Sequence, residues 1–282
     1  MSLMLKLLSA ILISSTLLSA KTLTIEDKII NFVTKAISTG NGYKFKKVTV
    51  IGSEKIDNMK GWKAYFLKID LVLPSKNNKE LSVKDIMFAN KYVIAKELID
   101  INNGRSLKSH FSLPADDSLY DDTHLLVGSK DAKNKLIVFS DPLCPFCMDF
   151  VPDVINFVKK HPKDLALYYY HYPLVIHPGS KSLVKAMLAA EKLGTIKDLE
   201  RKVYEEAFDF EKADEASVLK EFNKVFKTNL TLKDINTPDI LKRVENDSKV
   251  ARDLMISGTP TIYVNGRKDA SRKLYKKLVE KK

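Results

Sequence analysis

The only two cysteines of this 282-residue chain lie in one short run, DPLCPFC at residues 141–147. The apolar residues just before the run predict a buried strand, so Cys144 is expected where the next helix begins. Unpaired backbone N–H groups and the helix dipole stabilise a thiolate at that position. Because the thiolate is the species that attacks disulfides, the spacing predicts a redox-active dithiol.

The position of each cysteine predicts its role. Cys144 is nearer the helix start and is expected to be the exposed nucleophile, with a pKa lowered into the range of roughly 3.5–7.5. Cys147 lies one turn further into the helix and is expected to be the resolving thiol. The dipeptide between them tunes the redox potential: Pro145 suits a first helical turn, and Phe146 brings no charge, so the thiolate depends on backbone N–H groups.

Asp141 precedes the first cysteine and allows two interpretations of about equal weight. It could be a partly buried carboxylate that accepts the proton of Cys147. It could instead be a turn residue that caps the helix carrying the cysteines.

Two other uses of the cysteines are less favoured. A zinc site could combine them with His171 and His177, but this spacing is irregular and the histidines follow a predicted strand. A structural disulfide in so small a loop would constrain the chain little. We therefore expect no metal and no other cofactor.

The first twenty residues have the form of a secretory signal peptide. Lys6 precedes the mostly apolar stretch 7–18, and cleavage is expected after Ala20. The apolar stretch is too short and too rich in serine for a membrane-spanning helix. Export places the chain in an oxidising compartment, which we expect to be the periplasm.

Composition describes a globular protein, with 45% hydrophobic and 29% charged residues. The net charge of +12 comes from lysines and arginines spread along the chain. That distribution favours a lysine-rich solvated surface over a nucleic-acid or lipid surface, and we expect no nucleic-acid partner.

Residues 21–104 are predicted to form a small α+β unit. Thr24 can cap a helix with an apolar stripe, and strand-like runs follow at 43–51 and 62–73. A second helix is predicted over about 82–101. The irregular, acidic stretch 105–122 is interpreted as a linker.

Residues 123–282 are predicted to form an α/β domain. Strands are expected at 136–139, 165–172 and 262–264, with a helix from the cysteines to about residue 160. The stretch 180–256 is predicted to be largely helical, and a basic helix ends the chain. The run of tyrosines at 168–170 is interpreted as strand core rather than part of a substrate groove.

The sequence FSDPLCPFC at residues 139–147, followed far downstream by GTPT at 258–261, resembles the catalytic domain of exported thiol:disulfide oxidoreductases of the thioredoxin superfamily, in particular the DsbC/DsbG branch. The resemblance implies a thioredoxin-like domain with a helical subdomain inserted at about 180–256. Residues 21–104 would be the dimerisation domain. Pro260 would be a cis-proline facing the sulfurs, and Thr259 would pair with an extended substrate and tune its release.

The resemblance further implies a disulfide isomerase or reductase that acts on unfolded or misoxidised exported proteins. Such a protein would be a homodimer kept reduced by a DsbD-like membrane donor. One alternative is a dimeric DsbA-like oxidase that a DsbB-like partner reoxidises. Another is a holdase chaperone in which redox activity is secondary.

Overall fold

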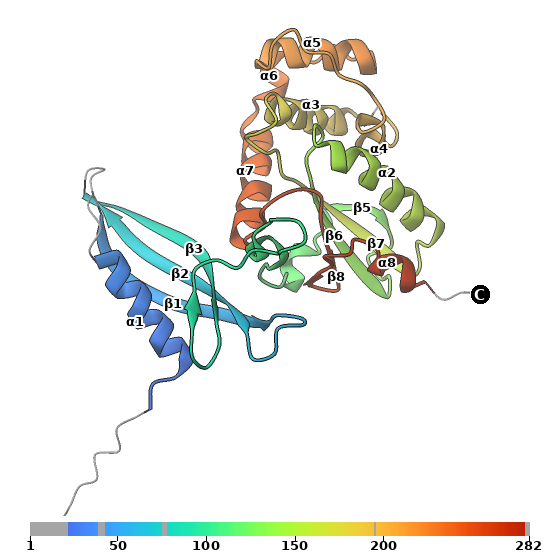
Figure 1. The fold of residues 1–282 in the computed structure, drawn as a ribbon. Coiled ribbons are helices and arrows are strands. Elements are labelled where there is room, and N and C mark those ends of the chain that lie inside the picture. The colour runs from blue at the N-terminus through green and yellow to red at the C-terminus, as the bar shows by residue number, and fades with distance from the viewer. Residues whose placement is uncertain (1–21, 39–42, 75–77, 195, 280–282) are drawn as a thin grey trace, which may run out of the picture.

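The computed structural model describes residues 22–38, 43–74, 78–194 and 196–279. The predicted signal peptide at 1–20 lies outside these ranges. None of the helices in the described ranges is long and apolar enough to cross a membrane. Figure 1 shows a small N-terminal lobe beside a larger C-terminal lobe, connected through the segment that follows the first sheet.

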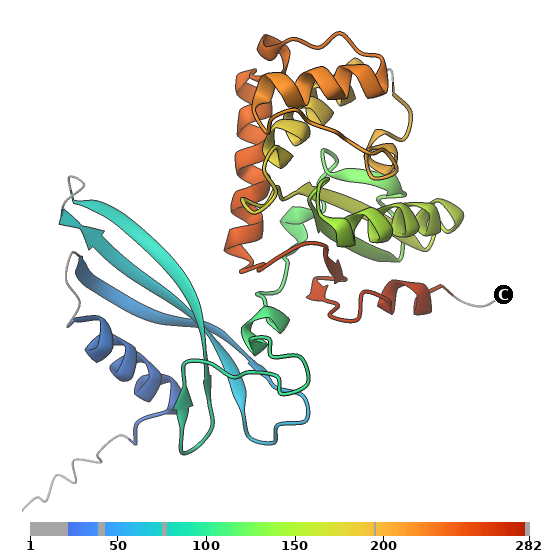
Figure 2. The ribbon, with the colours of Figure 1, turned by 45° about the horizontal axis from the view of Figure 1, so that its top comes forward.

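The N-terminal lobe is one helix on an antiparallel sheet with the strand order β1-β2-β3-β4. Its elements are α1 (Ile25–Ser38), β1 (Lys44–Lys55), β2 (Lys63–Leu73), β3 (Lys79–Ala89) and β4 (Ile94–Ala95). The helix begins after Thr24, whose hydroxyl accepts a hydrogen bond from the Asp27 N–H, as the cap prediction required. Ile29 and Val33 are buried against the sheet, and Figure 2 shows the helix covering one of its faces.

The helix predicted over 82–101 is wrong, because this segment consists of strand at 82–89, the short strand β4 and irregular turns. Strand β3 pairs with β2 along its whole length. Ile86 and Phe88 pack on one face of the sheet, whereas Met87 and Ala89 pack on the face covered by α1. Burial on both faces places apolar residues at consecutive positions, and such a run is easily mistaken for a helical stripe.

The segment 105–122 packs against both lobes. It contains the 3₁₀ turns η2 (Leu107–His110) and η3 (Asp117–Leu119). The ring of Phe111 meets Phe88 of the sheet edge-on at 6.0 Å. The N–H of Leu113 donates to the carbonyl of Leu254 at 2.9 Å, so the segment is also tied to the C-terminal lobe.

The C-terminal lobe is built on a sheet with the strand order β5-β7-β6-β8-β9, in which β6 and β7 are parallel and the other pairs are antiparallel. The strands are β5 (Leu125–Gly128), β6 (Asn134–Ser140), β7 (Leu165–His171), β8 (Thr261–Val264) and β9 (Arg267–Lys268). One face packs on α2 (Pro145–Lys160) and α8 (Leu274–Lys277). The other packs on the end of α7 (Pro238–Asp253) and on the segment before β5.

Both faces of this sheet are buried, so the tyrosines at 168–170 lie in the core on either face. Tyr169 faces α2, whereas Tyr168 and Tyr170 face α7, and all three are buried. The core interpretation is confirmed. The C-terminal helix α8 is shorter than predicted, and residues 280–282 lie outside the described ranges.

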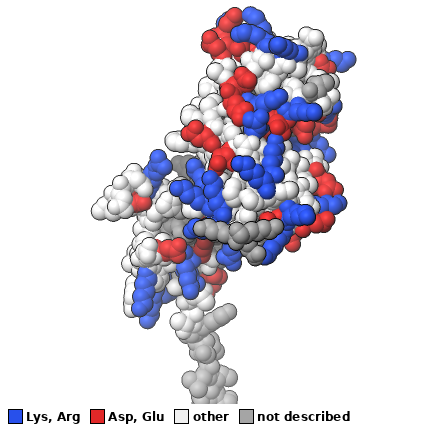
Figure 3. All heavy atoms as spheres, turned by 90° about the vertical axis from the view of Figure 1, so that its right-hand side faces the viewer, with Lys and Arg blue, Asp and Glu red and all other residues white. Residues whose placement is uncertain are grey.

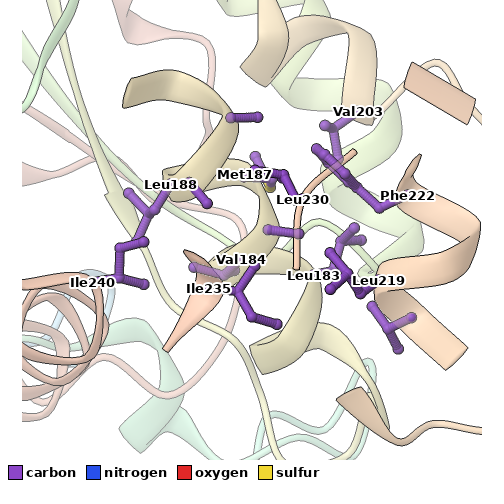
Figure 4. Close-up of a cluster of buried hydrophobic side chains, with 14 of the residues drawn as sticks. Leu183, Val184, Met187, Leu188, Val203, Leu219, Phe222, Leu230, Ile235 and Ile240 are labelled. Atoms are coloured by element: carbon purple, nitrogen blue, oxygen red, sulfur yellow. The ribbon is translucent and has the colours of Figure 1, made fainter. Parts of the chain in front are cut away.

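In the described residues between β7 and β8, five helices occupy the stretch predicted to be helical. They are α3 (Ser180–Leu193), α4 (Leu199–Val203), α5 (Glu215–Phe226), α6 (Leu232–Ile235) and α7. Their facing side chains, among them Met187, Phe222 and Ile240, form a hydrophobic core of their own (Figure 4). In Figure 1, α3, α5 and α6 lie beyond α2 and the sheet, whereas α7 runs from these helices down to the sheet.

Figure 3 shows the distribution of charged side chains over one face of the molecule. Lysines and arginines lie there in several separate groups, interspersed with acidic residues.

Candidate active site

The turn between β6 and α2 carries the Cys-x-x-Cys motif. Strand β6 ends at Ser140 and α2 begins at Pro145, with Cys144 as the extended N-cap residue. The Cys147 N–H donates to the Cys144 carbonyl at 2.8 Å, which starts the helix. Local structure therefore places the first sulfur at the helix N-terminus, where a thiolate is stabilised.

Cys144 is less exposed than predicted. Only 4% of its surface is accessible, and its Sγ donates to the carbonyl oxygen of Thr259 at 3.4 Å. The loop that carries Thr259 covers the sulfur, which the local sequence around the cysteine does not indicate. Attack on a disulfide requires the thiol to give up this hydrogen bond.

Cys147 is completely buried, and burial raises the pKa of its thiol to about 12. The N–H of Asp141 and the hydroxyl of Ser140 lower it by hydrogen bonding to the sulfur, and Thr259 lowers it to a smaller extent. A buried thiol with a raised pKa holds its proton at neutral pH. This suits a resolving thiol that is activated only after the first exchange step.

A chain of hydroxyl groups continues from Cys147 into the core. The Tyr204 hydroxyl donates to Ser140 Oγ at 2.7 Å and is in turn hydrogen-bonded to the Tyr169 hydroxyl. Tyr204 and Tyr169 are 4% and 3% exposed. Sequence reasoning missed Ser140 and Tyr204; the one available signal was a serine directly after the apolar residues 136–139.

Thr259 and Pro260 lie opposite the cysteines, and the peptide bond between them is cis. The geometry is the one implied by the family resemblance. The next residue, Thr261, fixes the loop by donating from its hydroxyl to the Gly258 carbonyl at 2.7 Å. The Thr259 hydroxyl is buried and makes no well-formed hydrogen bond of its own.

Asp141 is fully buried and accepts hydrogen bonds from four donors. They are Leu143 N at 2.8 Å, Leu174 N at 2.7 Å, His177 Nδ1 at 2.8 Å and Ser180 Oγ at 2.6 Å. The carboxylate thus joins the cysteine turn to the loop after β7 and to the start of α3. Asp141 accepts from Leu143 N–H within the turn, but its carboxylate does not cap α2, so the capping interpretation is wrong; proton acceptance from Cys147 stays a prediction.

The histidines of the zinc alternative lie apart from each other. The ring of His177 is hydrogen-bonded to Asp141. His171 is buried in the sheet, and its backbone N–H donates to the Asp247 carboxylate. Within the described ranges, no group of three or more His, Cys, Asp or Glu side chains is arranged to hold a metal ion.

Apolar side chains are exposed close to the cysteine turn. Phe146, between the cysteines, is 67% exposed. Val175 and Ile176, in the loop held by Asp141, are 98% and 78% exposed. Exposed apolar residues in a cluster are typical of a surface that contacts another molecule.

A dithiol at a strand–helix turn, opposite a cis-proline loop and on a mixed sheet with helices on both faces, defines a thiol-disulfide oxidoreductase with a thioredoxin-like fold. A sequence profile described as thioredoxin matches residues 120–281. The chain belongs to this thioredoxin family.

Among curated proteins, the chain is similar to a probable disulfide bond formation protein D of Bacillus cereus, with 28% identity over 156 residues, which cover 51% of this chain and 71% of the relative. It is also similar to the Na(+)/H(+) antiporter NhaA 1 of Mycolicibacterium gilvum, with 27% identity over 150 residues, which cover 50% of this chain but only 23% of the antiporter. The chain thus spans less than a quarter of that second relative.

Similar solved structures include oxidised BdbD from Bacillus subtilis, with 20% identity, a TM-score of 0.45, and coverage of 60% of this chain and 95% of that chain. Another is the catalytic domain of Proteus mirabilis ScsC, with 24% identity, a TM-score of 0.43, and coverage of 58% and 94%.

Proposed function

We propose that this protein is an exported disulfide isomerase or reductase that acts on exported polypeptides through Cys144 and Cys147. One geometric relationship carries the proposal. The first sulfur is hydrogen-bonded to the cis-proline loop, and the second is buried behind it with its pKa raised by burial. This divides the pair into an attacking and a resolving thiol.

The exchange begins when the Cys144 thiolate attacks a substrate disulfide. A bond forms between Cys144 and one substrate sulfur, and the other substrate sulfur leaves as a thiolate. In isomerisation a substrate thiolate later attacks this mixed disulfide and returns Cys144 as a thiolate, with no net transfer of electrons.

Reduction uses the second cysteine. Cys147 loses its proton and attacks the Cys144 sulfur, so the intramolecular disulfide forms and the substrate leaves with two thiols. Two electrons pass to the substrate, and a dithiol donor must supply them again. We propose a DsbD-like membrane protein in this role.

The surroundings of the dithiol suit an unfolded polypeptide. The backbone of Thr259 can pair with an extended segment, as in strand addition. The exposed side chains of Phe146, Val175 and Ile176 lie near the cysteine turn and can contact apolar residues of that segment. We further propose that residues 21–104 make a homodimer and that the chain acts in the periplasm after cleavage of its signal peptide.

The second candidate function is a disulfide oxidase, in which electrons flow from the substrate to the cysteine pair. The similar Bacillus cereus protein is named for disulfide bond formation, which favours an oxidase that donates the Cys144–Cys147 disulfide. A DsbB-like acceptor would then reoxidise the pair.

The two directions differ in the steady-state redox state of the pair. Cells that produce the full chain are quenched in acid, and free thiols are then alkylated with a reagent that shifts the protein on a gel. An isomerase or reductase is found mainly reduced. Full oxidation in intact cells would refute that direction and favour the oxidase. Cys144→Ala and Cys147→Ala proteins give the gel positions expected for single thiols.

A further inference from the structure

A cavity of about 350 Å³ lies directly beside the cis-proline loop. Thr259 and Pro260 line it on one side, β9 and the turn after it on another, and the segment that joins the two lobes on a third. The cavity is therefore continuous with the backbone that is expected to pair with a substrate.

Three cationic side chains and a histidine are among the residues that line this cavity, which we call the cationic pocket. Arg105 and His110 come from the joining segment, and Lys268 and Arg272 come from β9 and the turn that follows. The first pair lies more than 150 positions before the second in the sequence, and the two are brought together where Lys268 Nζ donates to the Ser109 carbonyl at 2.7 Å. Composition alone could not reveal the grouping.

Acidic side chains act on this group without pairing directly with it: Glu54 partly offsets the charge of Lys268, and Asp100 interacts with His110. In the described parts of the chain, no carboxylate lies within salt-bridge distance of Arg105, Lys268 or Arg272. Asp269 also lines the pocket, but its carboxylate accepts from Ser271 and from the Leu274 N–H.

The pKa of Lys268 shows that the positive charges in the pocket repel one another. Burial and the nearby Arg272 lower the pKa of Lys268 to about 8, and Glu54 opposes this only in part. An anion bound in the pocket would relieve the repulsion between these side chains. The planar guanidinium groups of Arg105 and Arg272 are suited to pair with a carboxylate.

We propose that the cationic pocket binds an aspartate or glutamate side chain of the polypeptide segment that pairs with Thr259, so that the protein favours cysteines with acidic neighbours. A residue in an extended segment advances about 3.3 Å, so one or two residues carry the segment from the cis-proline loop into the adjoining pocket. This substrate preference rests on the proposed disulfide exchange.

The test compares two peptides that carry one cysteine as a 2-pyridyl disulfide. One peptide has Asp and Glu beside the cysteine, and the other has Asn and Gln at the same positions. Attack by Cys144 on the peptide sulfur forms the mixed disulfide and releases 2-thiopyridone, whose absorbance gives the rate. The wild-type full chain is expected to react at least about threefold faster with the acidic peptide at low salt, and to lose this preference at high salt.

The decisive variant removes two charges of the pocket, Arg105→Gln with Arg272→Gln. Neither side chain makes a hydrogen bond or an ion pair within the described ranges, so the variant is expected to fold. Its rates with the two peptides should become equal, while its rate with the amide peptide stays at the wild-type value. The matched control, Lys242→Gln with Lys277→Gln, removes two exposed charges elsewhere and should keep the preference.

Equal rates of wild type with both peptides, or an acidic preference that survives in the pocket variant, would overturn the proposal. Oxidised glutathione tests a small anion as the ligand: if the pocket variant slows its reaction as much as that of the acidic peptide, the polypeptide assignment is wrong.

A second measurement separates binding in the pocket from disulfide exchange. Tighter binding of a cysteine-free acidic peptide to the Cys144→Ala, Cys147→Ala protein, measured by fluorescence anisotropy, supports the pocket even if disulfide exchange is absent. Equal binding of acidic and amide peptides counts against it.

Discussion

The Sγ of Cys144 lies 3.4 Å from the carbonyl oxygen of Thr259, which is 115 residues further along the chain. This contact brings the helix N-terminus that stabilises a thiolate against the loop that can bind a substrate backbone. The loop also covers the sulfur. The reactivity of Cys144 therefore depends on whether a substrate segment is bound at the cis-proline loop. Cys147 lies behind it, fully buried.

The release of substrate by Cys147 should depend on pH in a defined direction. Burial raises the pKa of this thiol to about 12, so at neutral pH only a small fraction is thiolate. That fraction grows about tenfold per pH unit below the pKa, so release from a preformed Cys144 mixed disulfide should accelerate about tenfold per unit from pH 6 to 9. Stopped-flow measurement of peptide release after a pH jump checks this. A rate that levels off below pH 8 would contradict the burial of Cys147 as the controlling factor.

The hydroxyl chain behind Cys147 should matter for the same step. Ser140→Ala removes a donor to the sulfur and should slow release about tenfold, because a hydrogen bond to a charged group is worth about 1.5–3 kcal/mol. Tyr204→Phe acts through Ser140 and should slow release by a smaller factor, about threefold. The initial attack by Cys144 should be unchanged in both variants.

A tyrosine at a different site provides the control for these variants. The Tyr275 hydroxyl donates to Asp153 at 2.9 Å and not to Ser140, so Tyr275→Phe should release substrate at the wild-type rate. If this variant slows release as much as Tyr204→Phe does, the effect is one of general packing and the hydroxyl chain has no special role.

Asp141 should be important for stability as well as for the position of the cysteine turn. Asp141→Asn replaces one acceptor oxygen by a donor NH₂ group in a site lined by four donors, which leaves buried donors unpaired. We expect the free energy of unfolding to fall by about 3 kcal/mol, measured by urea denaturation of the reduced protein. Asp149→Asn, an exposed change on α2, should alter it by less than about 0.5 kcal/mol. A loss below about 1 kcal/mol for Asp141→Asn would mean that the site rearranges to satisfy its donors.

Local sequence was sufficient for the elements that carry the dithiol. An apolar strand, a turn with two cysteines and an N-terminal proline predict β6 and α2, and the observed elements agree. Long-range packing was accessible only through the family resemblance, which placed Pro260 and Thr259 opposite the sulfurs. The bonds from Asp141 to the loop after β7 and to the start of α3, and the contact between Tyr204 and Ser140, join distant segments and were not predicted.

In the N-terminal lobe, the prediction of secondary structure from local sequence was wrong for one segment. The segment 82–101 has apolar residues at spacings that fit a helix, but strand pairing with β2 on one edge and burial of both faces made it β3 and β4. A propensity-based prediction cannot include the neighbouring strand, which here decides the structure.

Covalent trapping tests the central claim, that Cys144 attacks and Cys147 resolves. Cys147→Ala, Cys144→Ala and the double variant are produced as full chains in cells that export them, free thiols are blocked in acid, and adducts are separated on non-reducing gels and identified by mass spectrometry. We predict that Cys147→Ala accumulates mixed disulfides with exported polypeptides through Cys144, whereas Cys144→Ala and the double variant accumulate none. Equal trapping by Cys144→Ala, or its absence in Cys147→Ala, would contradict the account.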